Sequence, residues 1–302
     1  MLLVLHTIMN KLIYHLLLVP TSHLPLSVLH GISNVMYYII YRIFGYRKAV
    51  VRQNLIQSFP KKSFAEILEV EKAFYRHFCD LIVESVKNFT ISEAAAKKRI
   101  KITNPEVLER YFNKGQRVIL VGGHYNNWEL FALAVAGQIK HTPMALYSPL
   151  KNAFWNKKIT DSRSKYGLHM LRIDSILHKM KTQKEEQFAV IFGSDQSPRR
   201  SQLVHFTRFL NQETAVAYGA ERMAREFDMP IIAGANLKVA RGYYEIIFTL
   251  VSDDHSKFKE GEITAAFTAL LEKDILGAPQ YWLWSHKRWK YNRSEHDADR
   301  II

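Results

Sequence analysis

The run Arg117-Val-Ile-Leu-Val-Gly-Gly-His-Tyr-Asn-Asn-Trp-Glu-Leu130 decides how we expect the chain to fold. Its four apolar residues are typical of a strand that is buried on both faces of a parallel sheet, and the two glycines end that strand. His124 follows the glycines, and Glu129 comes five residues later. Because functional sites in open α/β sheets collect beyond the carboxyl ends of strands, the run predicts a site here.

His124 and Glu129 form a candidate pair of a general base and its orienting carboxylate. Residues five apart on one continuous helix point about 140° from each other, so we expect His124 before the helix and Glu129 in its first turn. Glu129 can then accept from one imidazole nitrogen and leave the other to take a proton from a hydroxyl group. In the alternative interpretation, Asn126 and Glu129 form a capping-box-like pair and His124 only closes a turn.

Outward from this run, helices and strands alternate. That order predicts an α/β fold with a mostly parallel central sheet flanked by helices. The expected strands cover residues 117–121, 142–147, 168–173, 188–192, 230–239 and 243–251. The expected helices cover residues 105–113, 130–138, 152–166, 175–184, 214–227 and 262–276.

The start of the chain has the composition of a membrane-anchoring helical segment. No Asp, Glu, Lys or Arg occurs between Lys11 and Arg42, and residues 24–41 are about as long as a bilayer-spanning helix, which needs roughly 20 residues. Pro20 and Pro25 interrupt the run, so a helix lying in the membrane interface is the alternative to a span. The basic cluster that begins at Arg42 predicts that the following chain stays cytoplasmic.

A long helix is expected after the anchor. Ser63 can cap it, with Glu66 as a capping-box partner three residues later. We therefore predict three parts: a membrane anchor over 1–45, a helical connecting segment over 46–100, and an α/β catalytic domain over 101–302.

Composition narrows the classes of partner and chemistry. The net charge of +14 favours anionic partners: nucleic acid, acidic phospholipid, a phosphorylated substrate or an acidic carrier protein. Cys79 is the only cysteine, which excludes a disulfide framework and is expected to be a core thiol. The chain has no P-loop, no dinucleotide glycine fingerprint and no His-Glu-x-x-His run, so a bound metal is not required.

Three further features are candidates for a site. Asp195 follows the predicted strand at 188–192, where it is either a substrate or structural anchor or a turn-forming residue. Arg163 lies late in a predicted helix, on a solvated face or at a phosphate. The aromatic and basic run over 279–291 suits an interfacial aromatic belt better than nucleic-acid stacking, because the other end of the chain is apolar.

Four blocks, in order along the chain, resemble the lipid A biosynthesis (lauroyl/myristoyl) acyltransferase family, part of a lysophospholipid-acyltransferase-like superfamily with a His-x4-Asp/Glu motif. The blocks are Arg47-Lys-Ala-Val-Val-Arg-Gln-Asn-Leu-Ile-Gln-Ser-Phe-Pro60, Gly123-His-Tyr-Asn-Asn-Trp-Glu129, Ser194-Asp-Gln-Ser-Pro198 with Phe206-Thr-Arg-Phe-Leu-Asn-Gln-Glu-Thr214, and Pro279-Gln-Tyr-Trp-Leu-Trp-Ser-His-Lys-Arg-Trp-Lys290.

The resemblance implies transfer of a fatty acyl chain from an acyl-carrier-protein or coenzyme A thioester to a hydroxyl of a membrane lipid. The acceptor would be a lipid A precursor, a lysophospholipid or an aminolipid, at the cytoplasmic face of the bacterial inner membrane. No cofactor beyond the acyl thioester is implied, and no nucleic acid. The alternative is a catalytically silent lipid-binding or scaffold protein at the membrane.

The resemblance also assigns roles. His124 would be the general base, Glu129 would orient it, and Arg163 would stabilise the oxyanion, with backbone N–H groups of residues 122–126 as further donors. Asp195 and Asn127 would contact or support the bound substrate. The chain departs from the usual motif at Tyr125-Asn126 and at Asn211, which puts the shape of the acceptor pocket in doubt.

Overall fold

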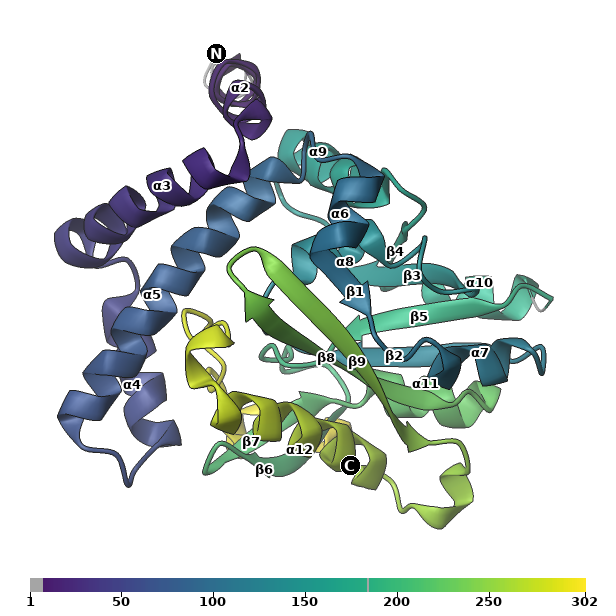
Figure 1. Ribbon diagram of the computed structural model, residues 1–302. Coiled ribbons are helices and arrows are strands. Elements are labelled where there is room, and N and C mark those ends of the chain that lie inside the picture. Colours follow the sequence, from purple (N-terminus) through teal and green to yellow (C-terminus); the bar gives the residue numbers. More distant parts are fainter. Residues whose placement is uncertain (1–7, 184) are drawn as a thin grey trace.

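The computed structural model describes residues 8–183 and 185–302, and its centre is a seven-stranded sheet. The strand order is β1-β9-β8-β2-β5-β3-β4, and neighbours are parallel except for the antiparallel pair β8 and β9. The predicted α/β class with a mostly parallel sheet is therefore confirmed (Figure 1). The strands are β1 (Ile100–Ile102), β2 (Val118–Gly122), β3 (Thr142–Tyr147), β4 (His169–Arg172), β5 (Phe188–Gly193), β8 (Ile231–Ala240) and β9 (Tyr243–Ser252).

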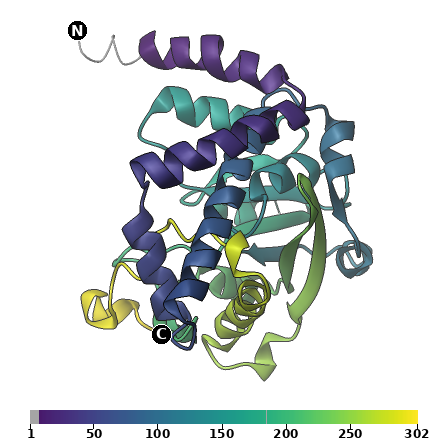
Figure 2. The same cartoon turned by 60° about the vertical axis from the view of Figure 1, so that its left-hand side comes forward.

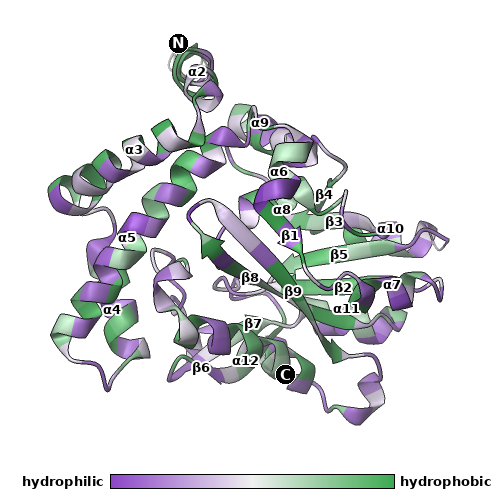
Figure 3. Ribbon diagram, viewed as in Figure 1, coloured by the Kyte–Doolittle hydropathy of each residue, from purple (hydrophilic) through white to green (hydrophobic). Residues whose placement is uncertain are grey.

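Helices cover both faces of the sheet, as Figure 1 shows. One apolar core joins β2 to α6, α7 and α8, and another joins the opposite face to α10, α11 and α12. Strands β2 and β5 are coloured as hydrophobic in Figure 3, as expected for strands with helices on both sides. These helices are α6 (Glu93–Arg99), α7 (Glu106–Phe112), α8 (Trp128–Ala134), α9 (Ala153–Ser164), α10 (Ile176–Thr182), α11 (Gly219–Phe227) and α12 (Glu262–Gly277). The end of the helix predicted over 175–184 falls on residue 184, outside the described residues.

One predicted helix is partly wrong. Residues 214–217 belong to a strand, and α11 begins only at Gly219. Strands β6 (Val204–Phe209) and β7 (Gln212–Ala217) form a separate antiparallel hairpin. Its turn residues, Leu210 and Asn211, both have positive φ, as the tight turns of hairpins require. A leucine is unusual at such a position, which is why the turn is hard to recognise in the sequence.

Before α4 (Lys48–Ser58), the N-terminal region consists of two helical runs, each made of consecutive α- and π-helical segments. Leu24 is extended, as is usual before a proline, and this breaks the chain between α2 and α3. Within the described residues no helix has both the length and the apolar character that a bilayer crossing requires, so the predicted span is not found. The pieces are η1 (Ile13–Leu18), α2 (Val19–His23), α3 (Leu26–Tyr37), η2 (Tyr38–Phe44) and α4 (Lys48–Ser58).

Helix α5 (Phe64–Lys87) lies between α3 and the sheet (Figures 1 and 2). The predicted capping box is confirmed: the Ser63 hydroxyl accepts from the Glu66 backbone, and the Glu66 carboxylate accepts from the Ser63 backbone. Cys79, on the buried face, is fully enclosed, and burial followed by the nearby Asp80 charge raises the pKa of its thiol to about 12. The prediction of an inert core thiol is confirmed.

The end of the chain closes the fold with short 3-10 turns. Trp282 and Trp284 are almost fully buried against Phe59 and Phe209, so they form core and not an interfacial belt. The prediction of an exposed aromatic belt over 279–291 is wrong for these two indoles. These turns are η4 (Pro279–Tyr281), η5 (Arg293–Glu295) and η6 (Ala298–Arg300), and a further 3-10 turn, η3 (His255–Lys257), precedes α12.

Candidate active site

The ends of β2 and β5 place the central residues of the site. The two strands are parallel neighbours, and Gly122 pairs with Gly193 in their register. His124 and Asp195 each come two residues after these partners. Parallel strands that end at the same edge therefore bring two side chains together that are 71 residues apart in sequence.

His124 is bound by Asp195. Its Nδ1 lies 2.7 Å from Asp195 Oδ1, and its backbone N–H donates to Asp195 Oδ2 at 2.8 Å. The carboxylate accepts only, so Nδ1 carries the hydrogen and Nε2 is left with a free lone pair. The second ring nitrogen lies 3.3 Å from the side-chain amide nitrogen of Gln196. His124 therefore has the tautomer and orientation of a general base.

Charge and burial oppose each other at this pair. Burial lowers the pKa of His124, but the Asp195 carboxylate outweighs it, so the pKa is raised above its usual 6.5. Burial would raise the pKa of Asp195, yet the imidazole and three hydrogen bonds hold it down at about 2. One of these bonds comes from the indole of Trp282 to Oδ2 at 2.8 Å. Asp195 is thus a fixed anion at the Nδ1 edge of the imidazole.

The predicted hydrogen bond from His124 to the Glu129 carboxylate is wrong. Glu129 does lie in the first turn of α8 and His124 does precede that helix, as predicted. Its carboxylate, however, forms a two-point ion pair with Arg163 from α9, with Nε–Oε2 at 2.8 Å and NH2–Oε1 at 2.5 Å. Asp195 makes the hydrogen bond with the imidazole that we predicted for Glu129, because the register of β2 and β5 places Asp195 beside His124.

Arg163 and Asn127 are also constrained by these contacts. Two nitrogens of Arg163 are engaged by Glu129, and the side chain lines a cavity beside His124. Asn127 is buried, and its Oδ1 accepts from the Leu130 backbone as the cap of α8. The predicted contact between Asn127 and substrate has no support in this geometry, and the cap is Asn127 instead of Asn126.

Two backbone donors of the motif are already engaged. The N–H of His124 donates to Asp195, and the N–H of Asn126 donates to the carbonyl of Tyr281 at 2.9 Å. The expected oxyanion donors among residues 122–126 therefore exclude these two. The side chains of Arg163 and Gln196 are further donors at the cavity close to His124.

Glycines leave room for the imidazole and for Asp195. A Cβ on Gly193 would lie 3.2 Å from His124 Cε1. A Cβ on Gly123 would lie 2.6 Å from a methyl of Leu271 and 3.2 Å from Asp195 Oδ2. Close approach of these side chains to the backbone therefore favours glycine at both strand ends.

A cavity of about 420 Å³ opens beside His124. Its polar lining includes His124, Arg163 and Gln196, and Trp128 packs edge-on against the imidazole at 5.0 Å between ring centres. Much of the remaining lining is apolar and comes from strands and from α8: Leu120, Phe131, Leu146, Met170, Ile191 and Phe248. An imidazole, polar donors and a largely apolar lining therefore share one cavity. No group of three or more potential metal ligands is found among the described residues.

Sequence reasoning missed the roles of Trp282 and Gln196. The strand-end position of Asp195 was a usable signal, because it parallels that of His124, but the pairing of β2 with β5 was not known. Nothing in the sequence links Trp282 to Asp195 before the fold brings the C-terminal segment against the site.

Comparison with known proteins adds independent findings. A family model described as bacterial lipid A biosynthesis acyltransferase matches residues 2–291. The lipid A biosynthesis palmitoleoyltransferase of Escherichia coli (strain K12) is 22% identical over 244 residues, which cover 81% of this chain and 79% of that protein. The lipid A biosynthesis acyltransferase of Shigella flexneri gives the same identity and coverage.

Proposed function

The chain belongs to the bacterial lipid A biosynthesis acyltransferase family, which makes it an acyltransferase enzyme, and from that premise we propose that it moves a fatty acyl chain from a thioester to a hydroxyl of a lipid A precursor. The observation that supports this proposal is the His124–Asp195 pair, in which His124 lines the largely apolar cavity. A base that faces a chamber lined by hydrocarbon side chains suits an acyl substrate.

In the proposed mechanism, His124 Nε2 removes the proton of the acceptor hydroxyl while that oxygen attacks the thioester carbonyl. Asp195 stabilises the imidazolium that forms, as the acid of a catalytic triad does. The tetrahedral intermediate collapses, the C–S bond breaks, and the imidazolium returns its proton to the leaving thiolate. The product is an ester, and no protein nucleophile takes part.

Glu129 takes a revised role in this proposal. It holds Arg163, and the guanidinium nitrogen that Glu129 does not engage is the proposed donor to the oxyanion. The side-chain amide of Gln196, at 3.3 Å from Nε2, is a second donor on the same side.

The donor is proposed to be an acyl thioester of acyl-carrier protein, with coenzyme A as the alternative carrier. The net charge of +14 favours an acidic carrier protein and a phosphorylated lipid acceptor alike. A lysophospholipid or an aminolipid remains the alternative acceptor. No cofactor is needed beyond the thioester.

Membrane association is proposed at the N-terminal pieces, at the cytoplasmic face of the inner membrane. Exposed apolar side chains gather there, led by Phe44 (77% exposed) and Ile43 (73%), and the chain carries Arg42 before them and Arg47 and Lys48 after them. Such a patch with a basic rim suits an anionic lipid surface. Vesicle sedimentation tests this: Ile43→Ser with Phe44→Ser should weaken binding to anionic vesicles, whereas Leu276→Ser, at an exposed leucine of α12, should not.

The experiment for acyl transfer supplies purified protein with acyl-carrier-protein or coenzyme A thioesters and with each acceptor class, and reads products by mass spectrometry. We expect an acylated lipid A precursor, abolished by His124→Ala. The control is His178→Ala, at an exposed histidine of α10. Lipid binding without any product would favour the catalytically silent alternative.

A further inference from the structure

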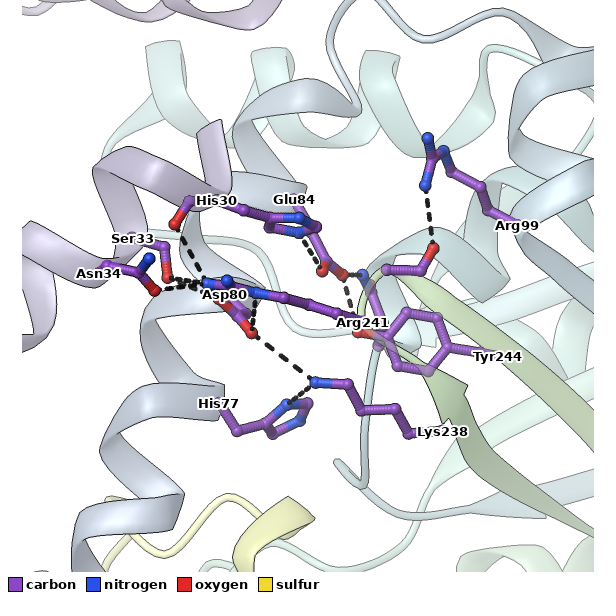
Figure 4. A network of polar contacts seen from close by, with 12 residues as sticks. His30, Ser33, Asn34, His77, Asp80, Glu84, Arg99, Lys238, Arg241 and Tyr244 are labelled. Carbon is purple, nitrogen blue, oxygen red and sulfur yellow. Dashed lines mark hydrogen bonds and ion pairs between the residues drawn. The ribbon is translucent and has the colours of Figure 1, made fainter. Parts of the chain in front are cut away.

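Glu84 is a buried acid of α5 that contacts the catalytic loop. Only 4% of the residue is exposed. Its Oε2 accepts from Asn127 Nδ2 at 2.6 Å and from the Tyr244 hydroxyl at 2.8 Å, and its Oε1 lies 3.0 Å from His30 Nε2. Figure 4 shows this carboxylate between α3, α5 and the β8–β9 hairpin. One side chain thus joins three elements and a loop.

Asn127 links Glu84 to the candidate site. Its other side-chain atom, Oδ1, accepts from the Leu130 backbone at 2.8 Å and so caps α8. Glu129 lies in the first turn of the same helix and holds Arg163. The orientation of the Asn127 amide therefore determines both the contact with Glu84 and the start of the helix that carries Glu129.

We propose that Glu84 is a positioning residue for acyl transfer, which acts through Asn127 and the start of α8 on the Glu129–Arg163 pair. This inference rests on the proposed function. Glu84 does not line the cavity beside His124, so its effect on the reaction is indirect. Without an acceptor at this position, the Asn127 amide and the Tyr244 hydroxyl lose their partner. A buried donor without a partner is costly, so we expect a local rearrangement. A displacement of about 1 Å at a catalytic group is enough to slow a reaction about 100-fold.

Asp80 supplies a matched control. It lies one turn earlier on α5, is 5% exposed and belongs to the same polar network in Figure 4. Its Oδ1 accepts from the Ser33 hydroxyl and from Arg241, both at 2.6 Å. These partners lie on α3 and in the β8–β9 turn, away from the 124–129 loop. Asp80 therefore shares the burial and the network of Glu84 without its contact to the site.

The experiment compares Glu84→Met, Glu84→Gln and Asp80→Asn in the full chain. Glu84→Met keeps the length of the side chain and removes the acceptor, so kcat should fall about 10- to 100-fold with little change in KM. Glu84→Gln keeps an acceptor oxygen for Asn127 and Tyr244 and should restore most of kcat. Asp80→Asn should lower the melting temperature and leave kcat at the parent value.

Two further readouts separate positioning from folding. The acidic limb of the pH profile of kcat/KM should move no further in Glu84→Met than in Glu129→Gln, because Asp195, which contributes most to the raised pKa of His124, is untouched. If Glu84 acts through Asn127, then combining Glu84→Met with Asn127→Ala should cost no more than Asn127→Ala alone.

Parent kcat in Glu84→Met, or an equal loss of kcat in Asp80→Asn, would overturn the positioning role. An active parent with either of these results overturns this inference alone. Absence of acyl transfer by the parent chain overturns the proposed function, and this inference with it.

Discussion

The end of β5 and the first turn of α8 each place one carboxylate near His124, but the two carboxylates differ in burial and in their partners. Asp195, from β5, is buried, bound to His124 and held by an indole. Glu129, from α8, is close to His124 in sequence but 23% exposed and bound to Arg163. The comparison teaches that strand register, and not distance along the chain, selects the partner of the base. Each prediction below separates the two carboxylates.

The largest effect is expected for Asp195→Asn. The amide oxygen can keep the bonds from the His124 backbone and Trp282, so its NH2 group turns toward Nδ1. Nε2 must then carry the hydrogen, and the base is lost, which predicts a fall in kcat of about 10⁴-fold. Steady-state acyl transfer measures this. A smaller loss of kcat in Asp195→Asn than in Glu129→Gln would contradict the assignment of Asp195 as the more important of the two acids.

Glu129→Gln is expected to be less severe. The amide keeps the shape of the side chain but removes the charge that fixes Arg163, and a weakened oxyanion donor costs about 10²-fold in kcat. The control is Asp161→Asn, which breaks an exposed ion pair to Lys157 on the same helix as Arg163 and should leave kcat unchanged. Full activity in Glu129→Gln would contradict the proposed role of Arg163.

Gly193→Ala tests the strand end that carries Asp195. Its Cβ would lie 3.2 Å from His124 Cε1, so the imidazole must move, and we expect a loss of about tenfold in kcat. The register partner, Gly122, gives the control, because its Cβ would make an ordinary 3.5 Å contact with a backbone oxygen. A larger loss of kcat in Gly122→Ala than in Gly193→Ala would contradict the proposal that the new contact with His124 causes the loss.

The pH profile should show the smallest difference between the two acids. His124 must be neutral to act, and its pKa is raised, so kcat/KM should fall as the pH drops through a value above 6.5. Asp195 makes the main contribution that raises this pKa, and Glu129 a lesser one. In Glu129→Gln the acidic limb should therefore move slightly toward lower pH. A shift toward higher pH would contradict this assignment.

Much of the fold was predictable because its strands are short apolar runs between turn residues. β3 spans the predicted residues, β5 extends one residue beyond its predicted end, and β2 is shifted by one residue at both ends. The β6–β7 hairpin was missed because a leucine occupies its positive-φ turn. The N-terminal apolar run was expected to anchor the chain in a membrane, with Pro20 and Pro25 as interruptions, but α3 turns Leu29, Ser33 and Tyr37 into the fold.

The site was half predictable. His124 and the start of α8 followed from a strand, two glycines and the periodicity of a helix. The partner of His124 did not, because the sequence contains no information on which strand neighbours β2 until the whole sheet is assembled. Trp282 and Glu84 are reached only through contacts between segments far apart in the chain.

The chamber beside His124 has a consequence for which donors the enzyme accepts. A chain too short to fill it loses about 0.8 kcal/mol for each missing methylene, which is roughly a fourfold change in affinity. If the acyl chain binds in this cavity as proposed, a chain too long must displace lining side chains such as Met170 and Phe248, and overpacking of this kind costs about 1–3 kcal/mol. Selectivity for chain length should therefore be asymmetric, with a gradual decline on the short side and a sharp limit on the long side.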